Sequence, residues 1–158
     1  MDPGLSAAAA RIFADVLGEF AFLFGDPVPA SELPPLSGKG YLASLPFHGE
    51  VQGRVSFVVP EGLALEIAAN TLGIERTEPE ASRRAQDAIK EVASVLGGHL
   101  AGAMGRPSQA VELSPPELSG LENSEWERLR FDPATQCFAV NEYPAMLRVE
   151  ILPEGRST

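Results

Sequence analysis

The chain has 158 residues, of which 44% are hydrophobic, and its 22 acidic residues against 12 basic ones give a formal net charge of −10. This length and hydrophobic fraction predict one domain with a sizeable core. So large an acidic excess repels nucleic-acid phosphates and anionic lipid headgroups, which argues against both as partners. The simplest interpretation of the charge is the solubility of a cytosolic protein.

The single cysteine, Cys137, excludes an intrachain disulfide. It lies in an alternating segment, residues 136–140, and is expected to be a buried structural thiol. The first residues lack the basic start of a signal peptide, and Arg11, Asp15 and Glu19 interrupt the apolar stretch that follows. Neither a signal peptide nor a membrane span is therefore expected, and the sequence predicts a cytoplasmic location.

The first half of the chain alternates between helical and extended patterns. Apolar residues recur at three- and four-residue intervals from Leu5 to Gly25, which predicts a first long helix within residues 1–25. A proline-rich loop is expected at 27–38. Two strands follow, Gly40–Pro46 and Val51–Val59, and then a short helix, Leu63–Leu72.

The second half begins with a charged linker at 74–80 and a long helix from Ser82 to Gly105. Extended segments are expected at 109–113 and, after a turn, at three places: Trp126–Phe131, Gln136–Glu142 and Ala145–Leu152. Helices segregated from strands with short connections predict an α+β fold. We expect a single domain over 1–158 with two long helices on a mainly antiparallel sheet.

The helix within 81–105 has two unlike faces when residues are placed about 100° apart. One stripe carries carboxylates and then almost no side chains: Asp87, Glu91, Ser94, Gly98 and Gly105, flanked by Ala101 and Gly102. The other side predicts the buried face: Ala85, Ala88, Ile89, Val92, Val95, Leu96, Leu100 and Ala103. His99 falls toward this apolar side and is expected to be a core histidine. Its distance from the other histidine, His48, gives no zinc-binding spacing.

Glycines interrupt this helix at an energetic cost. Gly97, Gly98 and Gly102 lie within six residues of one another, and glycine in a helix interior costs about 1 kcal/mol relative to alanine. Close packing on the sheet would explain Gly97. It does not explain Gly98 and Gly102 on the outward side, where a bare surface would let the backbone of another protein come close. We interpret this stripe as a docking surface.

The outward stripe also resembles the helix motif of the CheC/CheX/FliY chemotaxis phosphatases. In that motif, Asp or Ser is followed after three residues by Glu, after two more by Asn, and by Gly four residues later. Here the segment is Asp87, Glu91, Ser94 and Gly98. The flanking segments at 49–57 and 111–116 are similar to the strands around the family's motif, so the resemblance covers about residues 40–118.

The resemblance implies a substrate and roles for individual residues. The substrate would be the acyl phosphate on an aspartate of a CheY-like receiver domain. Glu91 would pair with the receiver's active-site lysine, and the residue at position 94 would orient the attacking water. Asp87, Gly98, Ala101 and Gly102 would contact the receiver. The receiver would carry Mg²⁺, so the chain needs no cofactor or metal of its own, and a CheX-like homodimer is also implied.

Position 94 departs from the motif because this chain has Ser94 where the family has asparagine. A serine hydroxyl can donate and accept hydrogen bonds, but on a shorter arm. A misplacement of about 1 Å can cost on the order of 100-fold in rate, so we expect receiver docking with weak or absent phosphatase activity. Two alternatives stay open: a non-catalytic adaptor that binds a response regulator or a flagellar switch component, and a face that forms a homo-oligomer.

The first long helix echoes the motif spacing with Asp15, Glu19 and Phe22. Such an internal repeat suits two pseudo-symmetric halves, each led by a long helix, as the family is built. Phe22 occupies the asparagine position of the echo. The first helix is therefore not expected to be a second active site.

Overall fold

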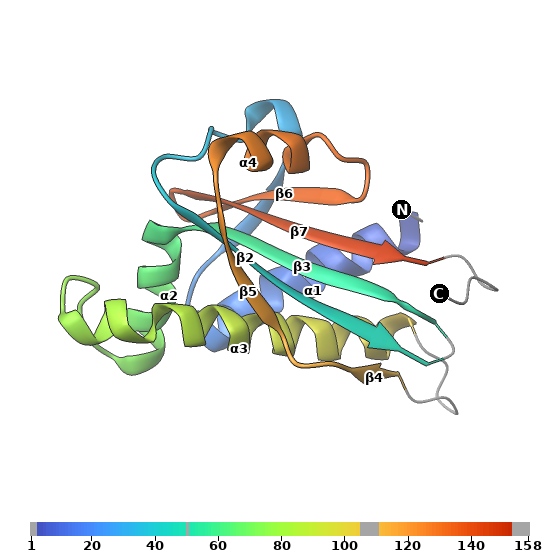
Figure 1. Cartoon of the computed structure of the whole chain (residues 1–158), viewed down its shortest axis with the longest axis horizontal. Coiled ribbons are helices and arrows are strands. Elements are labelled where there is room, and N and C mark those ends of the chain that lie inside the picture. Colours follow the sequence, from blue (N-terminus) through green and yellow to red (C-terminus); the bar gives the residue numbers. More distant parts are fainter. Residues whose placement is uncertain (1–2, 50, 105–110, 153–158) are drawn as a thin grey trace.

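The computed structural model describes residues 3–49, 51–104 and 111–152. Within these residues one seven-stranded sheet carries three helices on one face and a short helix on the other (Figure 1). The helices are α1 (Pro3–Ala21), α2 (Glu61–Leu72), α3 (Pro79–Met104) and α4 (Asn123–Arg130), with a 3₁₀ turn η1 (Ala30–Glu32). The strands are β1 (Gly25–Val28), β2 (Gly40–His48), β3 (Gly53–Pro60), β4 (Glu112–Leu113), β5 (Glu117–Leu121), β6 (Thr135–Val140) and β7 (Tyr143–Ile151).

The strand order shows the two halves that the sequence echo predicts. The sheet runs β1-β6-β7-β3-β2, with β4 and β5 both pairing with β2, and every pairing is antiparallel. About the boundary between β7 and β3, the β2–β3 hairpin matches the β6–β7 hairpin, and β5 matches β1. Strand β1 follows the long helix α1, and β5 follows the long helix α3 and the short strand β4. Each of the two pairs with one strand of a hairpin, β1 with β6 and β5 with β2. The α+β fold with two long helices on an antiparallel sheet is confirmed.

The main core lies between the sheet and the three helices α1, α2 and α3. Alternate residues of β3 point into it: Val55, Phe57 and Val59 are all completely buried, as the period of a strand requires. Phe13 of α1 packs against strands from both halves of the sheet, β3 and β6. Its ring stacks on Phe138 of β6 with centroids 3.9 Å apart, and it forms an edge-to-face pair with Phe57 of β3 with centroids 5.9 Å apart.

A second, smaller core covers part of the opposite sheet face beneath α4 and the loop after η1. Its centre is Trp126, which is completely buried and donates its indole N–H to the carbonyl of Pro34 at 3.2 Å. The strand predicted at Trp126–Phe131 is therefore wrong, because this segment is helix α4. Trp126 and Leu129 are three residues apart, so in a helix both face the sheet while the charged residues between them stay outside.

The end of α1 also differs from the sequence prediction. The helix ends at Ala21 rather than Gly25, and Gly25–Val28 forms strand β1 within what was expected to be helix end and loop. Strand β1 is at the sheet edge and pairs only with β6. Pro27, which has no backbone N–H to donate, can therefore lie in β1 because no strand on its other side needs that hydrogen bond. Strand β5 was likewise not predicted.

The remaining differences are at the boundaries of elements. Helix α3 begins at Pro79, three residues before the predicted start. Its predicted end at Gly105 and the start of the extended segment at 109–110 lie outside the described residues, while Glu112–Leu113 forms β4 as expected. Cys137 is buried, as predicted. None of the helices in the described ranges has the length and apolar character needed to cross a membrane.

Gly97 and Gly98 are a matched pair for testing how closely α3 approaches the sheet. A Cβ on Gly97 would lie 2.7 Å from Cδ1 of the buried Leu45, whereas a Cβ on Gly98 would meet nothing nearer than Leu113 at 3.9 Å. Gly98→Ala is expected to raise the free energy of unfolding by about 0.5–1 kcal/mol. Gly97→Ala is expected to be less stable than Gly98→Ala by about 1–3 kcal/mol because it overpacks the core. Urea denaturation measures both, and equal stabilities would contradict the close approach.

Candidate functional site

Helix α3 presents an outward ridge that the described chain leaves uncovered. We call Asp87, Glu91, Ser94, Gly98 and Gly102 the motif ridge. All but Ser94 are exposed, and Ser94 is half-buried. The inward face of the same helix holds Ile89, Val92 and Leu96, which are completely buried. The amphipathic pattern of α3 thus directs the carboxylates of Asp87 and Glu91 to the surface.

An open hollow of about 610 Å³ lies beside this ridge. Three elements form it: α3, the end of α1 and the turn before β5. Its lining consists of Phe20, Arg84, Asp87, Lys90, Glu91, Ser94, Val95 and Pro116. Glu91 and Ser94 therefore share one concave surface with apolar side chains from two other segments. A convex part of another protein can enter such a surface.

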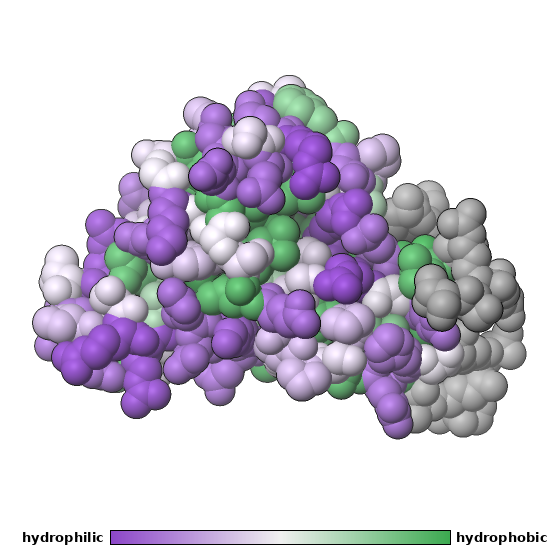
Figure 2. Space-filling view, in the orientation of Figure 1, coloured by the Kyte–Doolittle hydropathy of each residue, from purple (hydrophilic) through white to green (hydrophobic). Residues whose placement is uncertain are grey.

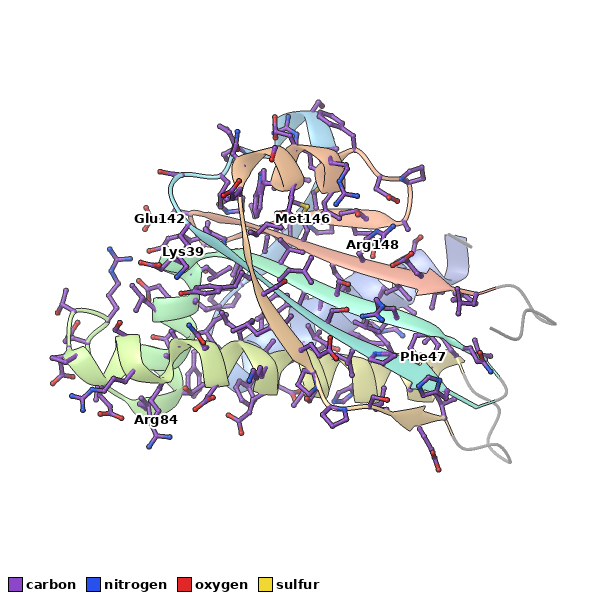
Figure 3. The ribbon with its side chains drawn as sticks, viewed as in Figure 1. Lys39, Phe47, Arg84, Glu142, Met146 and Arg148 are labelled. Carbon is purple, nitrogen blue, oxygen red and sulfur yellow. The ribbon has the colours of Figure 1, made fainter. Side chains whose placement is uncertain are left out.

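Some charged side chains of the hollow already form ion pairs within the chain, and others do not. Arg84 donates from Nε to Glu80 at 3.0 Å, one helical turn away, and extends away from the protein body (Figure 3). Over residues 3–49, 51–104 and 111–152, no ion pair or side-chain hydrogen bond engages Asp87 or Glu91. Both carboxylates are therefore available for an intermolecular ion pair, which is worth more where docking excludes water.

Ser94 is one turn after Glu91 and offers a hydroxyl that can both donate and accept. Neither asparagine nor glutamine lines the hollow. Asn70 instead donates from Nδ2 to the carbonyl of Ala21 at 2.7 Å, and Asn141 accepts at Oδ1 from the backbone N–H of Phe24. In the described part of the chain, therefore, the amide missing from position 94 is not replaced from elsewhere.

Three predictions about the last turns of α3 are wrong. Ala101, expected on the edge of the docking surface, is buried, with 6% of its surface exposed. His99, expected in the core, is exposed, and so is Ala103. Gly97 and Ala101 are four residues apart and share a side of the helix, and Gly97 packs against Leu45. His99 is about 200° around the helix from Gly97 and thus faces outward.

The echo of the motif in α1 makes no second site. Phe22 lies beyond the end of α1 with a left-handed φ of 57° and is 71% exposed. The position that would correspond to Ser94 is therefore not on a helix at all. Glu19, which corresponds to Glu91, is exposed but is not part of the hollow.

Sequence reasoning missed the residues that complete the hollow. Phe20 belongs to the other long helix, where its spacing indicated only a core position, and Lys90 and Val95 are on the flank of the motif ridge. Pro116 comes from the turn that the resemblance had matched to the family's strand and proline. These side chains meet only through the packing of α1 and the β5 turn on α3, which no local pattern encodes. The potential metal ligands in the described ranges form no cluster of three or more.

A family model and several solved structures match this chain. The sequence profile of the family described as "Chemotaxis phosphatase CheX" matches residues 41–129. No curated protein sequence matches the chain significantly.

Several solved structures share the fold. CheX from Vibrio vulnificus is 17% identical, with a TM-score of 0.70 and coverage of 94% of this chain and 99% of that one. A CheC-like protein from Shewanella sp. PV-4 is 14% identical, with a TM-score of 0.67 and coverage of 97% and 100%. A chain of the CheX–CheY–BeF₃–Mg²⁺ complex from Borrelia burgdorferi is 12% identical, with a TM-score of 0.65 and coverage of 94% and 98%.

Proposed function

The chain belongs to the CheX family of chemotaxis phosphatases, and from this membership we propose that it docks through the motif ridge on a phosphorylated CheY-like receiver domain and hydrolyses its aspartyl phosphate slowly. In the reaction, a water oxygen attacks phosphorus and the bond to the aspartate oxygen breaks. The products are inorganic phosphate and the receiver's free aspartate. Mg²⁺ would be bound by the receiver, and such a partner implies a cytoplasmic location.

The observation that carries this proposal is the shared hollow of Glu91 and Ser94. An unpaired carboxylate and a hydroxyl lie one turn apart on an exposed helix, within a family whose members are phosphatases. Glu91 is suited to pair with a lysine of the receiver, which would fix the two proteins relative to each other. Positioning of this kind is the main way in which proteins accelerate phosphoryl transfer.

One solved relative supports the choice of partner. The Borrelia burgdorferi structure is a complex of CheX with CheY, BeF₃ and Mg²⁺, and a chain of it covers 94% of this chain. At 12% identity this likeness establishes the fold and not the partner. The exposed, unpaired state of Asp87 and Glu91 in the present chain is the independent support for a charged protein partner.

Ser94 limits the proposed reaction because its hydroxyl ends closer to the helix than an asparagine amide does. Ser94→Asn is expected to increase phosphate release by on the order of 100-fold, with little change in receiver affinity. The assay mixes the chain with an acetyl-phosphate-treated CheY-like receiver of the same organism and follows inorganic phosphate.

Ser82→Asn is a matched control for this assay because Ser82 is exposed on α3 but outside the hollow. It should leave the rate unchanged. Wild-type turnover far above the receiver's own decay, with no increase in Ser94→Asn, would contradict the role of Ser94.

Glu91→Ala tests whether the motif ridge binds the receiver. Loss of a charge-assisted contact costs about 1.5–3 kcal/mol, so affinity for a beryllofluoride-loaded receiver should fall about 10- to 100-fold. Titration calorimetry measures this affinity. Glu19→Ala, at the echo position on α1, should bind as the wild type does. Equal affinities of Glu91→Ala and wild type would reject the ridge as the docking surface.

A non-catalytic adaptor is the second candidate function, and the serine at position 94 favours it. An adaptor would bind the beryllofluoride-loaded receiver through Glu91 without adding to phosphate release. Failure of both wild type and Ser94→Asn to release phosphate, together with Glu91-dependent binding, would establish the adaptor.

The bare end of the ridge gives a further test of docking. A Cβ on Gly102 would contact nothing in the described chain within 4 Å, and the same holds for Gly120 at the sheet edge. Gly102→Gln should weaken receiver binding at least about 10-fold by holding the partner's backbone away, and Gly120→Gln should not. If the ridge instead forms a homodimer, light scattering will show a lower mass for Gly102→Gln than for the wild type. Adding the receiver will then not change the mass of either protein.

A further inference from the structure

The outer face of the sheet carries a row of polar side chains across four strands. In register, Glu117 lies opposite Ser44, Ser44 opposite Ser56, and Ser56 opposite Arg148. Ser44 and Ser56 are buried, with 6% and 4% of their surfaces exposed. These residues alternate with the core residues of the same strands and so face away from α1, α2 and α3. The motif ridge is therefore on the other side of the molecule.

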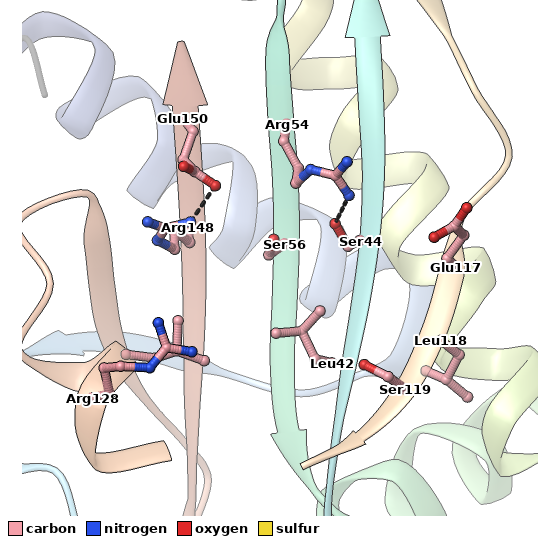
Figure 4. A pocket seen from close by; sticks show the side chains of 11 residues that line it. Leu42, Ser44, Arg54, Ser56, Glu117, Leu118, Ser119, Arg128, Arg148 and Glu150 are labelled. Atoms are coloured by element: carbon pink, nitrogen blue, oxygen red, sulfur yellow. Dashed lines mark hydrogen bonds and ion pairs between the residues drawn. The ribbon is translucent and has the colours of Figure 1, made fainter. Parts of the chain in front are cut away.

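A hollow of about 380 Å³ lies over this row, between β5 and α4. Figure 2 shows this face, where exposed apolar side chains below α4 are bordered by hydrophilic ones. Three arginines line the hollow, Arg54, Arg128 and Arg148, although the whole chain has only 12 basic residues and a net charge of −10. The arginines come from β3, α4 and β7 and therefore meet only in the folded protein (Figure 4).

Two carboxylates near the hollow, those of Asp132 and Glu150, already form ion pairs with Arg148. Arg148 forms an ion pair with Glu150 and a second one, through Nη2, with Asp132 at 3.0 Å. The pKa of Asp132 is held below its ordinary value, mainly by the backbone N–H of Ala134 and further by Arg148 and Arg128, against the opposing effect of burial. Glu150 lies opposite Arg54 in register, but its carboxylate bonds Arg148.

The other two arginines have unused donors. Arg54 donates to the neutral hydroxyl of Ser44 at 2.7 Å and forms no ion pair within the described residues. Arg128 forms neither a hydrogen bond nor an ion pair with any described residue. The Nε–H of Arg148 is buried and has no acceptor among the described residues. Glu117, on the far wall, is the remaining carboxylate of the lining. Arg54 and Arg128 are exposed at the rim of the hollow, where their donors can reach a ligand. The buried Nε–H of Arg148 calls for a bound anion or water as its acceptor.

We propose that this outer-face hollow binds the phosphate group of a small molecule. Guanidinium groups and serine hydroxyls are the donors that proteins use for phosphate oxygens. Leu42, Leu118 and Leu129, which also line the hollow, provide an apolar surface for an organic body attached to the phosphate. The volume is within the range of small-ligand sites. The ligand is therefore inorganic phosphate or a phosphate ester.

Side-chain NMR of the full chain tests this site directly. Titration with inorganic phosphate or phenyl phosphate at constant ionic strength should shift the Nε–Hε signals of Arg54, Arg128 and Arg148 in a saturable manner. The signal of Arg83, which is exposed on α3 and pairs with Glu80, should not move. Phenyl phosphate binding more tightly than inorganic phosphate identifies an ester ligand, and equal affinities identify free phosphate.

Arg54→Gln and Arg128→Gln should each weaken phosphate binding about 10-fold or more, whereas Arg83→Gln should not. Arg148 is left unchanged because it joins β7 to Asp132. Shifts that do not saturate, that sodium chloride reproduces, or that include Arg83 equally would overturn the proposal. The receiver assays address the opposite face, so either proposal can fail alone.

Discussion

The close contact between α3 and β2 at Gly97 and Leu45 is the constraint on which the candidate site depends. A methyl group at Gly97 would come within 2.7 Å of Leu45, so the helix backbone lies directly on the sheet there. Because α3 is one continuous helix of 26 residues, fixing its rotation at one point fixes the direction of every side chain along it. Glu91 is thereby directed outward, and the burial of Ile89 and Val92 maintains the same orientation nearer its start.

The two halves of the fold have the same plan but different long helices. Helix α1 ends at Ala21, and Phe22 adopts a left-handed conformation that turns the chain into β1. Helix α3 instead continues past Ser94 to Met104. The full motif spacing thus lies on one helix only, while α1 contributes the apolar Phe20 to the wall of the hollow beside it. A pseudo-symmetric fold therefore gives an asymmetric surface, with charge from one half and an apolar contact from the other.

The sheet separates two surfaces with different chemistry. On the helical side, unpaired carboxylates and bare glycines suit a protein partner with a positive charge. On the outer side, arginines from three elements surround buried hydroxyls. The strand period produces both, since neighbouring residues of β2, β3 and β7 face opposite sides. The same strands thereby fix the core beneath α3 and the polar row beneath the outer-face hollow.

The sequence by itself determined the α+β class, the motif spacing of Asp87, Glu91, Ser94 and Gly98, and the outward direction of that stripe, because helical periodicity is a local property. It misjudged Trp126–Phe131, since a short apolar alternation fits a strand or one helix face equally well, and only the second core decided between them. It also misplaced Ala101 and His99, because the packing of α3 on Leu45 sets which side of its last turns is buried. The walls of both hollows were decided by tertiary structure alone: Phe20 and Pro116 on one side, and Arg54, Arg128 and Arg148 on the other, are distant in sequence and meet only when the sheet and helices pack.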